Sequence, residues 1–211
     1  MHSDDLDSDD AQASEAGAAS GRKRPKPGER RVQILQTLAA MLEQPGAERI
    51  TTAALAARLQ VSEAALYRHF ASKAQMFEGL IEFIESSVFG LVQQITQRED
   101  DPRQCAARLV TMLLQFGEKN PGMVRVMVGD ALVFEHERLQ QRMNQFFDRI
   151  ESTLRQCLRA GAAGSATPTV DAQVAASVLA AFAVGRLQRY ARSGFKRLPT
   201  EHLDASLALI L

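Results

Sequence analysis

The sequence contains little cysteine, no tryptophan and none of the long hydrophobic runs from which membrane-spanning helices are made. Its 211 residues include 2 cysteines, Cys105 and Cys157. Two cysteines far apart in the chain argue against a disulfide scaffold, and we expect buried free thiols in a reducing cytosol. No stretch reaches about 18 consecutive apolar residues, and the acidic amino terminus has no hydrophobic segment typical of a secretion signal. These absences predict a cytoplasmic protein without a membrane anchor.

Catalytic and metal-binding motifs are missing as well. The four histidines, His2, His69, His136 and His202, have no metal-ligand spacing with each other or with the cysteines. The sequence lacks Gly-x-Ser-x-Gly, a glycine-rich phosphate loop and His-Glu-x-x-His. The recurring carboxylates Glu78, Glu82 and Glu85 are expected to form a solvated helix face. The sequence therefore predicts no enzyme, no catalytic residues, no metal and no cofactor.

The net charge of zero conceals an uneven distribution. Residues 1–20 hold six acidic residues and no Lys or Arg, whereas residues 22–73 hold ten basic residues against four acidic ones. Residues 74–211 hold fifteen of each sign. A local positive field favours a polyanion, because phosphates bind Lys and Arg and release counterions, although many basic stretches are only solvated surface. The acidic head lacks apolar periodicity, and we expect a disordered tail at residues 1–28.

Apolar residues recur at helical spacing along the rest of the chain, with no strand-like alternation. The first helix is marked by Val32, Leu35, Leu38, Ala39 and Leu42 and ends at Pro45-Gly46. Further helices are expected at residues 52–59, 62–69, 73–98, 102–120, 123–128, 134–159, 170–193 and 203–211. Ser62, Ser72 and Asp101 stand at three of these starts, where their side chains can cap a helix. The expected fold class is all-α, with about nine helices.

Residues 50–73, ITTAALAARLQVSEAALYRHFASK, match a helix-turn-helix pattern. Apolar anchors and many alanines allow two short helices to cross closely, and the second helix of such a unit enters the major groove of DNA. The expected DNA contacts are hydroxyls at the helix starts, groove-facing side chains and nearby basic side chains: Thr51, Thr52, Ser62, Glu63, Ala64, Ala65, Tyr67, Arg68, His69 and Lys73. A helical hairpin without a DNA role remains open on this pattern alone.

The segment VSEAALYRHFASK resembles the recognition-helix signature of TetR-type regulators, in which Leu-Tyr-x-x-Phe is followed by a Lys. These residues are Leu66, Tyr67, Phe70 and Lys73. The resemblance implies a TetR-like fold. It would have a three-helix DNA-binding domain at residues 29–72 and a helical domain at residues 73–211 that dimerises through its last two long helices.

Three segments of the body are similar to the nucleoid occlusion factors within this family: LIEFIE (80–85), FGEKNPG (116–122) and ALVFEHERLQQRMNQFFDRIE (131–151). The resemblance implies a nucleoid-associated homodimer that binds palindromic sites in double-stranded DNA, with one or several dimers per site. While bound, it would antagonise assembly of the tubulin-like division GTPase FtsZ and block septum formation over the nucleoid. The acidic head and the segment 22–27 depart from the subfamily's pattern.

The fourth helix carries the candidate partner surface. At about 100° per residue, Met76 and Phe83 fall outside the apolar arc centred on Phe77, and Gly79 and Gly90 lie on the same flank. An aromatic side chain surrounded by small residues can seat a peptide. The alternative is that Phe83 packs against a neighbouring helix or the DNA-binding unit.

The resemblance implies that the C-terminal tail of FtsZ docks between the fourth and fifth helices. Phe83 lies in the LIEFIE motif, and Lys119 and Asn120 lie in the FGEKNPG motif. A cation and an amide at a helix end can hold carboxylates of an acidic tail. The same two residues would also suit an ordinary charged and capped helix end.

Two other functions remain open. A ligand-gated TetR-type transcriptional repressor would need a pocket in the helical body. The scarcity of inward polar residues argues mildly against a polar effector, while an apolar effector stays compatible with the sequence. A purely structural helical protein would be indifferent to replacement of Arg68 and Lys73.

Overall fold

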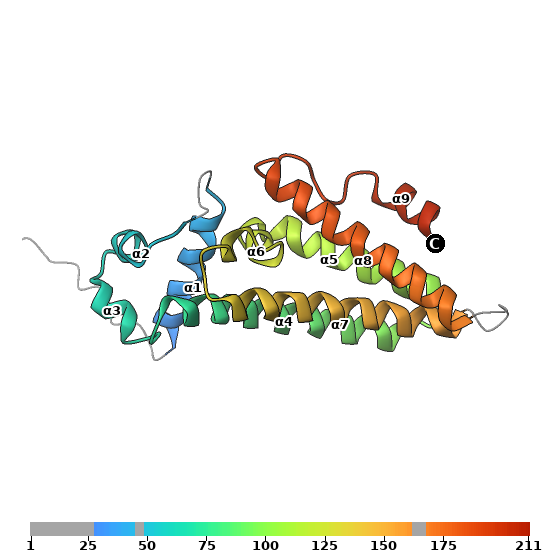
Figure 1. Ribbon diagram of the computed structural model, residues 1–211, viewed down its shortest axis with the longest axis horizontal. Coiled ribbons are helices and arrows are strands. Elements are labelled where there is room, and N and C mark those ends of the chain that lie inside the picture. The colour runs from blue at the N-terminus through green and yellow to red at the C-terminus, as the bar shows by residue number, and fades with distance from the viewer. Residues whose placement is uncertain (1–27, 45–48, 162–167) are drawn as a thin grey trace, which may run out of the picture.

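A computed structural model describes residues 28–44, 49–161 and 168–211, and the chain is all-α over these residues (Figure 1). The described elements are α1 (Glu29–Leu42), α2 (Thr52–Leu59), α3 (Glu63–Tyr67), α4 (Lys73–Arg98), α5 (Pro102–Lys119), α6 (Pro121–Met127), a 3-10 turn η1 (Asp130–Leu132), α7 (Glu137–Gly161), α8 (Pro168–Arg192) and α9 (Leu203–Ile210). The expected fold class is confirmed. The acidic head and the segment 22–27 lie outside the described residues.

Side-chain caps start the helices where the sequence indicated. The hydroxyl oxygens of Thr51, Ser62 and Ser72 accept backbone N–H groups at the starts of α2, α3 and α4. The Asp101 carboxylate accepts two backbone N–H groups at the start of α5, where Pro102 follows at the first helical position. Each cap satisfies donors that the first helical turn would otherwise leave unpaired.

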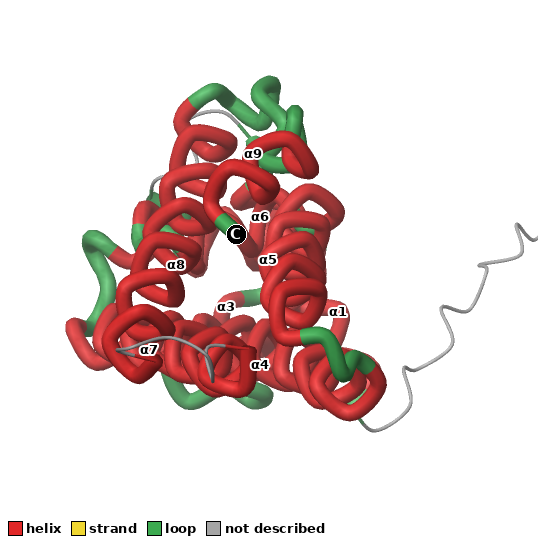
Figure 2. Tube along the Cα trace, turned by 90° about the vertical axis from the view of Figure 1, so that its right-hand side faces the viewer, coloured by secondary structure: helices red, strands yellow, loops and turns green. Residues whose placement is uncertain are grey.

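The body is built around α4, α5, α7 and α8, which Figure 2 shows nearly end-on. The long helix α7 packs along α8, α5 and α4. Periodicity predicts an inward face of Leu139, Met143, Phe146, Phe147, Ile150, Leu154 and Leu158, and all of these are buried except Phe147, which is partly buried. One continuous hydrophobic core runs from α1 to α9.

The amino-terminal helices join the body through a close helix contact. At Gly122 of α6, an added Cβ would lie 2.1 Å from the backbone oxygen of Ala39 in α1. Only glycine permits this approach, because any side chain would collide with the α1 backbone. Helix α1 therefore packs against α6 on one side, and it also packs against α2.

Several boundaries and burial predictions were wrong. Val32 is 54% exposed, and Ile34 occupies the core position of α1 instead. Leu91 was placed in the apolar arc of α4 but is 40% exposed, since α4 has less cover toward its C-terminal end. The helix expected from residue 134 begins at Glu137, and Phe134 is 68% exposed in the preceding loop. Helix α3 is shorter than expected and ends at Tyr67.

Within α8, Thr169–Arg192 is long and apolar enough by composition for a membrane span, and its most apolar 18-residue window has a mean hydropathy of 1.4. Abundant alanine and valine produce this value. The same helix packs against α5, α6 and α7 and carries buried alanines on that side. A core helix of a helical body accounts for these features, and a span chosen on composition alone is weak support for a membrane location.

Candidate DNA-binding and partner-binding sites

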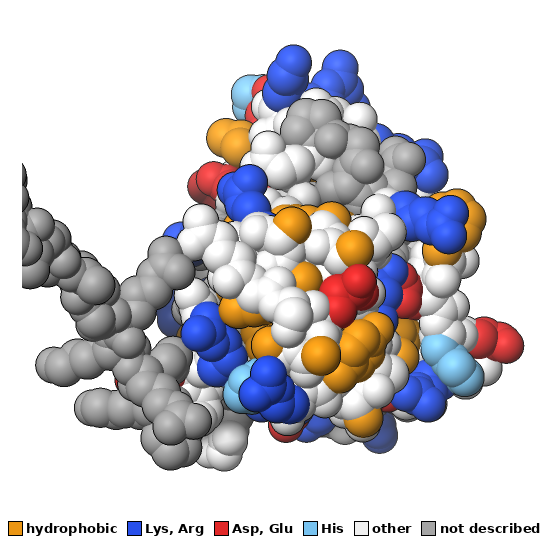
Figure 3. Space-filling view, turned by 90° about the vertical axis from the view of Figure 1, so that its left-hand side faces the viewer, with side chains coloured by type: hydrophobic (Ala, Val, Ile, Leu, Met, Phe, Trp, Pro, Cys, Tyr) orange, Lys and Arg blue, Asp and Glu red, His pale blue; other side chains and the backbone are white. Residues whose placement is uncertain are grey.

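The recognition unit consists of α2, a left-handed turn at Gln60 and α3. Leu55, Leu66 and Phe70 are each 1% exposed and belong to the hydrophobic core, in which α2 packs against both α1 and α3. The opposite side of α3 exposes Glu63, Ala64, Tyr67 and Arg68, followed by His69. Figure 3 views this end of the molecule: Lys and Arg side chains lie around its edge, and hydrophobic and uncharged side chains occupy most of its middle. This arrangement suits a groove-facing helix flanked by phosphate contacts.

Hydroxyl groups tie the start of α2 to the start of α3. Thr52 Oγ1 donates a 2.6 Å hydrogen bond to Glu63 Oε2, so this carboxylate is held back toward α2. Thr51 and Ser62 use their oxygens as helix caps, accepting from the N–H groups of Ala54 and Ala65. A hydroxyl that accepts one hydrogen bond still has a hydrogen to donate, so these two caps retain a donor for a phosphate oxygen. Ala65 is only partly exposed.

Arg31 of α1 contributes to the site, although its sequence context marked it only as part of a basic stretch. Its Nη1 donates to the backbone oxygen of His69 at 2.9 Å, and its guanidinium lies 4.1 Å from the centroid of the Phe70 ring. Through these two contacts, Arg31 of α1 holds the C-terminal end of the recognition helix in position. No local pattern could indicate this role, because the partners lie 38 positions away in the sequence.

Lys73, expected at a phosphate, forms an ion pair with Glu135 in the loop before α7. The pair is partly buried, with side-chain exposure of 26% for Lys73 and 10% for Glu135. Contact with DNA would therefore require Lys73 to exchange a carboxylate for a phosphate. The residue lies at the start of α4, which follows the recognition unit in the chain.

Two further ion pairs continue along the same side of α4. Glu78 pairs with Arg138 at 2.8 Å, and Glu85 receives two hydrogen bonds from Arg142, at 2.9 and 2.6 Å. The hydrogen bond to Glu85 raises the pKa of Arg142, against a smaller opposing effect of burial. The expected solvated face is thus wrong for Glu78 and Glu85, because α7 lies alongside them. Of the three carboxylates, only that of Glu82 belongs to an exposed residue.

The ion pair gives a matched test of the Lys73 prediction. We expect Lys73→Ala to weaken DNA binding about 3- to 10-fold on every sequence and to reduce the salt slope of log affinity by about 1. Glu135→Gln should instead tighten DNA binding, since it removes the competing carboxylate and leaves Lys73 free. Affinity measured across a salt series for both variants checks this. Equal weakening by both would mean that the pair only positions the recognition unit.

Phe83 stands on the surface of α4, with 46% of its side chain exposed. An added Cβ at Gly90, about two turns further on, would meet no atom within 4 Å, so this flank is open there. The expectation of an open flank was wrong at Met76, which is fully buried, and at Gly79, where an added Cβ would lie 3.0 Å from Leu35. The reason is that α1 covers the first turns of α4. The open flank begins only at Phe83.

Lys119 and Asn120 lie where α5 ends and α6 begins. Lys119 is exposed, and Asn120 Nδ2 donates to the backbone oxygen of Phe116 at 2.8 Å. Asn120 thus already satisfies a carbonyl at the end of α5, as the capping interpretation expects. Both residues lie on elements other than α4, which carries Phe83, and their role in partner binding stays a prediction.

The described residues contain no group of three or more His, Cys, Asp or Glu side chains that could hold a metal ion. The candidate sites described above are defined by exposed side chains on α3 and α4.

The fold has solved counterparts among TetR-type regulators. FadR from Bacillus subtilis, solved with stearoyl-CoA, superposes with a TM-score of 0.67 at 14% identity, covering 85% of this chain and 96% of that one. PfmR from Thermus thermophilus gives a TM-score of 0.67 at 21% identity, with coverage of 85% and 94%. These likenesses establish the fold alone.

Sequence comparisons match both halves of the chain. Residues 34–80 match the model of bacterial regulatory proteins of the tetR family, and residues 104–211 match the SlmA-like tetracyclin repressor-like C-terminal domain. The nucleoid occlusion factor SlmA of Idiomarina loihiensis is 51% identical over 177 residues, covering 83% of this chain and 90% of its own. The factor of the same name from Vibrio cholerae is 50% identical over 184 residues, with coverage of 86% and 93%. The chain therefore belongs to the TetR family and, within it, to the SlmA nucleoid occlusion factors.

Proposed function

We propose that this protein is a nucleoid occlusion factor that binds palindromic chromosomal sites as a homodimer and, while bound, antagonises FtsZ assembly. The observation that carries this proposal is the 50% identity with the Vibrio cholerae factor over 184 residues. That similarity extends through the body, whereas the regulators FadR and PfmR are 14% and 21% identical to this chain. The proposal places the protein in the cytoplasm, on the nucleoid.

DNA binding is assigned to the exposed side of α3 and to the hydroxyl groups that cap α2 and α3. A dimer would present two α3 helices to successive major grooves, about 34 Å apart, which explains a palindromic site. Arg68 and Tyr67 then face the bases, and Thr51, Ser62 and Lys73 face phosphates. Arg31 acts from behind as a positioning residue.

The homodimer is supported by an apolar stripe on the outer face of α8. Val170, Val174 and Val178 are 58%, 57% and 47% exposed and follow one another at intervals of four residues. Gly185 continues this face, where an added Cβ would meet no atom within 4 Å. An apolar stripe that faces solvent can be buried against the same stripe of a second copy. The two stripes would then form a contact with two-fold symmetry. We assign α8 as the main dimer helix, supported by α7 packed along it.

Partner binding is assigned to the open flank of α4 at Phe83. An exposed aromatic ring can anchor an extended or helical peptide, and the exposed cation Lys119 at the end of α5 suits an acidic segment. The FtsZ tail is the proposed ligand. DNA would act by stabilising the dimer conformer that binds FtsZ. Bound DNA must then raise the affinity for FtsZ, and bound FtsZ must raise the affinity for DNA by the same factor.

The test is sedimentation of FtsZ filaments with this protein, with and without a palindromic DNA that the protein selects from a random pool. We expect the pelleted fraction to fall only when the cognate DNA is present. Unchanged filaments despite tight and specific DNA binding would overturn the proposal. They would favour a ligand-gated repressor, for which apolar effectors should be tested first.

A further inference from the structure

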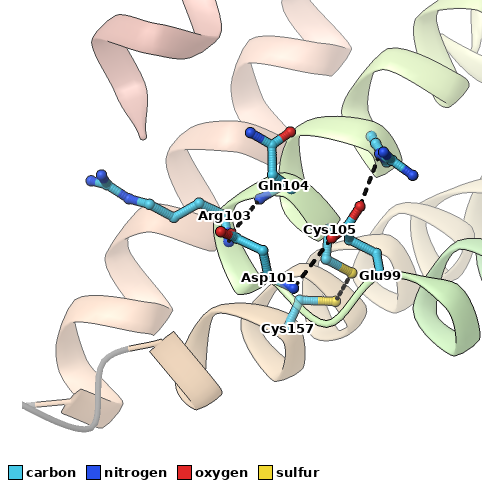
Figure 4. Close-up of polar contacts among 7 residues, drawn as sticks. Glu99, Asp101, Arg103, Gln104, Cys105 and Cys157 are labelled. Atoms are coloured by element: carbon cyan, nitrogen blue, oxygen red, sulfur yellow. Dashed lines mark hydrogen bonds and ion pairs between the residues drawn. The ribbon is translucent and has the colours of Figure 1, made fainter.

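The only two cysteines of the chain lie side by side in the body. Cys105 is in the first turns of α5 and Cys157 is near the end of α7, 52 positions away in sequence. Their Sγ atoms are 2.9 Å apart, and both are free thiols (Figure 4). Sequence spacing alone indicated two unrelated buried thiols, and the packing of α5 against α7 brings them together.

Both sulfur atoms are carried by well-anchored helices. The Asp101 carboxylate caps α5, and the backbone N–H of Cys105 donates to the Asp101 carbonyl oxygen at 2.8 Å. Cys157 lies between the buried residues Leu154 and Leu158 on α7. The two thiols therefore face each other at high effective concentration, which favours a bond between them over reaction with other molecules.

The two thiols differ in access. Cys105 is 3% exposed, whereas Cys157 is half-buried, so a small reagent reaches Cys157 first. Figure 4 shows Glu99, Asp101 and Arg103 near the pair, and Glu99 is paired with Arg108 at 3.1 Å. Burial, with the hydrogen bond to Cys105, raises the pKa of Cys157 to about 12. Thiolate is therefore scarce at neutral pH, and the reaction is expected to be slow.

We propose that Cys105 and Cys157 form a reversible intramolecular disulfide between α5 and α7 when the protein meets a peroxide. The Cys157 thiolate attacks one peroxide oxygen, the O–O bond breaks, and Cys157 becomes a sulfenic acid as water is released. Cys105 sulfur then attacks the Cys157 sulfur, the S–O bond breaks and a second water leaves. In total, two thiols and one hydrogen peroxide give one disulfide and two waters. A dithiol reductant restores both thiols. The proposal is independent of the proposed function.

The bond would tie the start of α5 to the end of α7 and close the chain between them into a loop. A cross-link of this kind restricts the unfolded chain more than the folded one, which raises the Tm by about 5–10 °C for a chain of this size. The recognition surface on α3 lies at the other end of the molecule, so DNA affinity should change less than about twofold, within the usual independence of distant sites.

The test exposes the reduced full-length protein to hydrogen peroxide at pH 8 and follows intact mass, free-thiol titration and Tm. We expect a loss of two hydrogens, a fall from two thiols to none, no covalent dimer, the rise in Tm and full reversal by dithiothreitol. Parallel treatment with oxidised glutathione separates peroxide chemistry from disulfide exchange. In that arm we expect slower formation, because the reagent is larger and must reach a half-buried sulfur.

Cys105→Ser and Cys157→Ser serve as controls. After peroxide treatment, the mass of each variant should stay that of the reduced protein or increase by added oxygen. Neither variant should lose two hydrogens or show the rise in Tm. Persistence of both thiols in the treated wild-type protein would overturn the proposal. So would a disulfide between two chains, or oxidation of Cys157 to a sulfinic acid with Cys105 still free.

Discussion

Phe83→Ala is expected to raise the concentration of DNA-bound protein needed to disperse FtsZ filaments by about thirtyfold, the effect of losing a central interface anchor worth about 2 kcal/mol. The reason is that Phe83 offers an exposed aromatic surface on an otherwise small-residue flank and contributes little to the core. DNA affinity, helix content and dimer mass should stay at wild-type values. Filament sedimentation with cognate DNA measures the first effect, and circular dichroism with light scattering checks the rest.

Phe134→Ala is the matched control, because Phe134 is 68% exposed and lies on a different element. It should leave FtsZ antagonism intact. If Phe83→Ala unfolds the protein or separates the dimer, Phe83 belongs to the core or the dimer contact, and the partner surface must be sought elsewhere. If both alanine variants lose activity equally, the effect does not belong to the α4 flank.

Arg68→Ala should lower affinity for the cognate palindrome by about 10- to 100-fold, corresponding to about 1–3 kcal/mol for a side chain that reads a base or holds a phosphate. Arg68 follows α3 directly and is exposed, so its removal should leave the fold unchanged. Competition binding against scrambled DNA distinguishes the two modes. Loss confined to the palindrome indicates base reading, and uniform loss indicates a phosphate contact.

Arg192→Ala, at the end of α8, removes the same charge from an exposed position outside the recognition unit. It should change affinity by less than twofold once salt is at physiological strength, because screening limits the reach of a charge to about 8 Å. Unchanged affinity in Arg68→Ala would remove Arg68 from the DNA interface.

Short-range sequence patterns predicted the features that depend on interactions between residues close together in the chain. The caps at Ser62, Ser72 and Asp101 and the inward stripe of α7 depend on residues a few positions apart, and all are present. The exposure of Phe83 also followed from helical periodicity. These features need no knowledge of how the helices pack.

Contacts between distant segments could not be read in the same way. Periodicity assigns a side of a helix to the core but does not say which neighbour covers the remaining sides, so Met76 and Gly79 were placed on an open flank that α1 in fact covers. The pairing of Lys73 with Glu135 joins residues 62 positions apart, and the cysteine pair joins residues 52 positions apart. Charge counts and spacing carry no information about such pairs.

The close contact of Gly122 with the Ala39 backbone should couple the unfolding of α1 to the unfolding of α6. Helix α1 belongs to the DNA-binding end by sequence, yet it is packed against α6 without an intervening side chain. A proteolytic fragment ending near residue 72 would lose this support and expose the covered side of α1, so it should not persist as a folded unit. In hydrogen exchange, the amides of α1 and α6 should open together, as one cooperative unit that crosses the sequence boundary between the two domains.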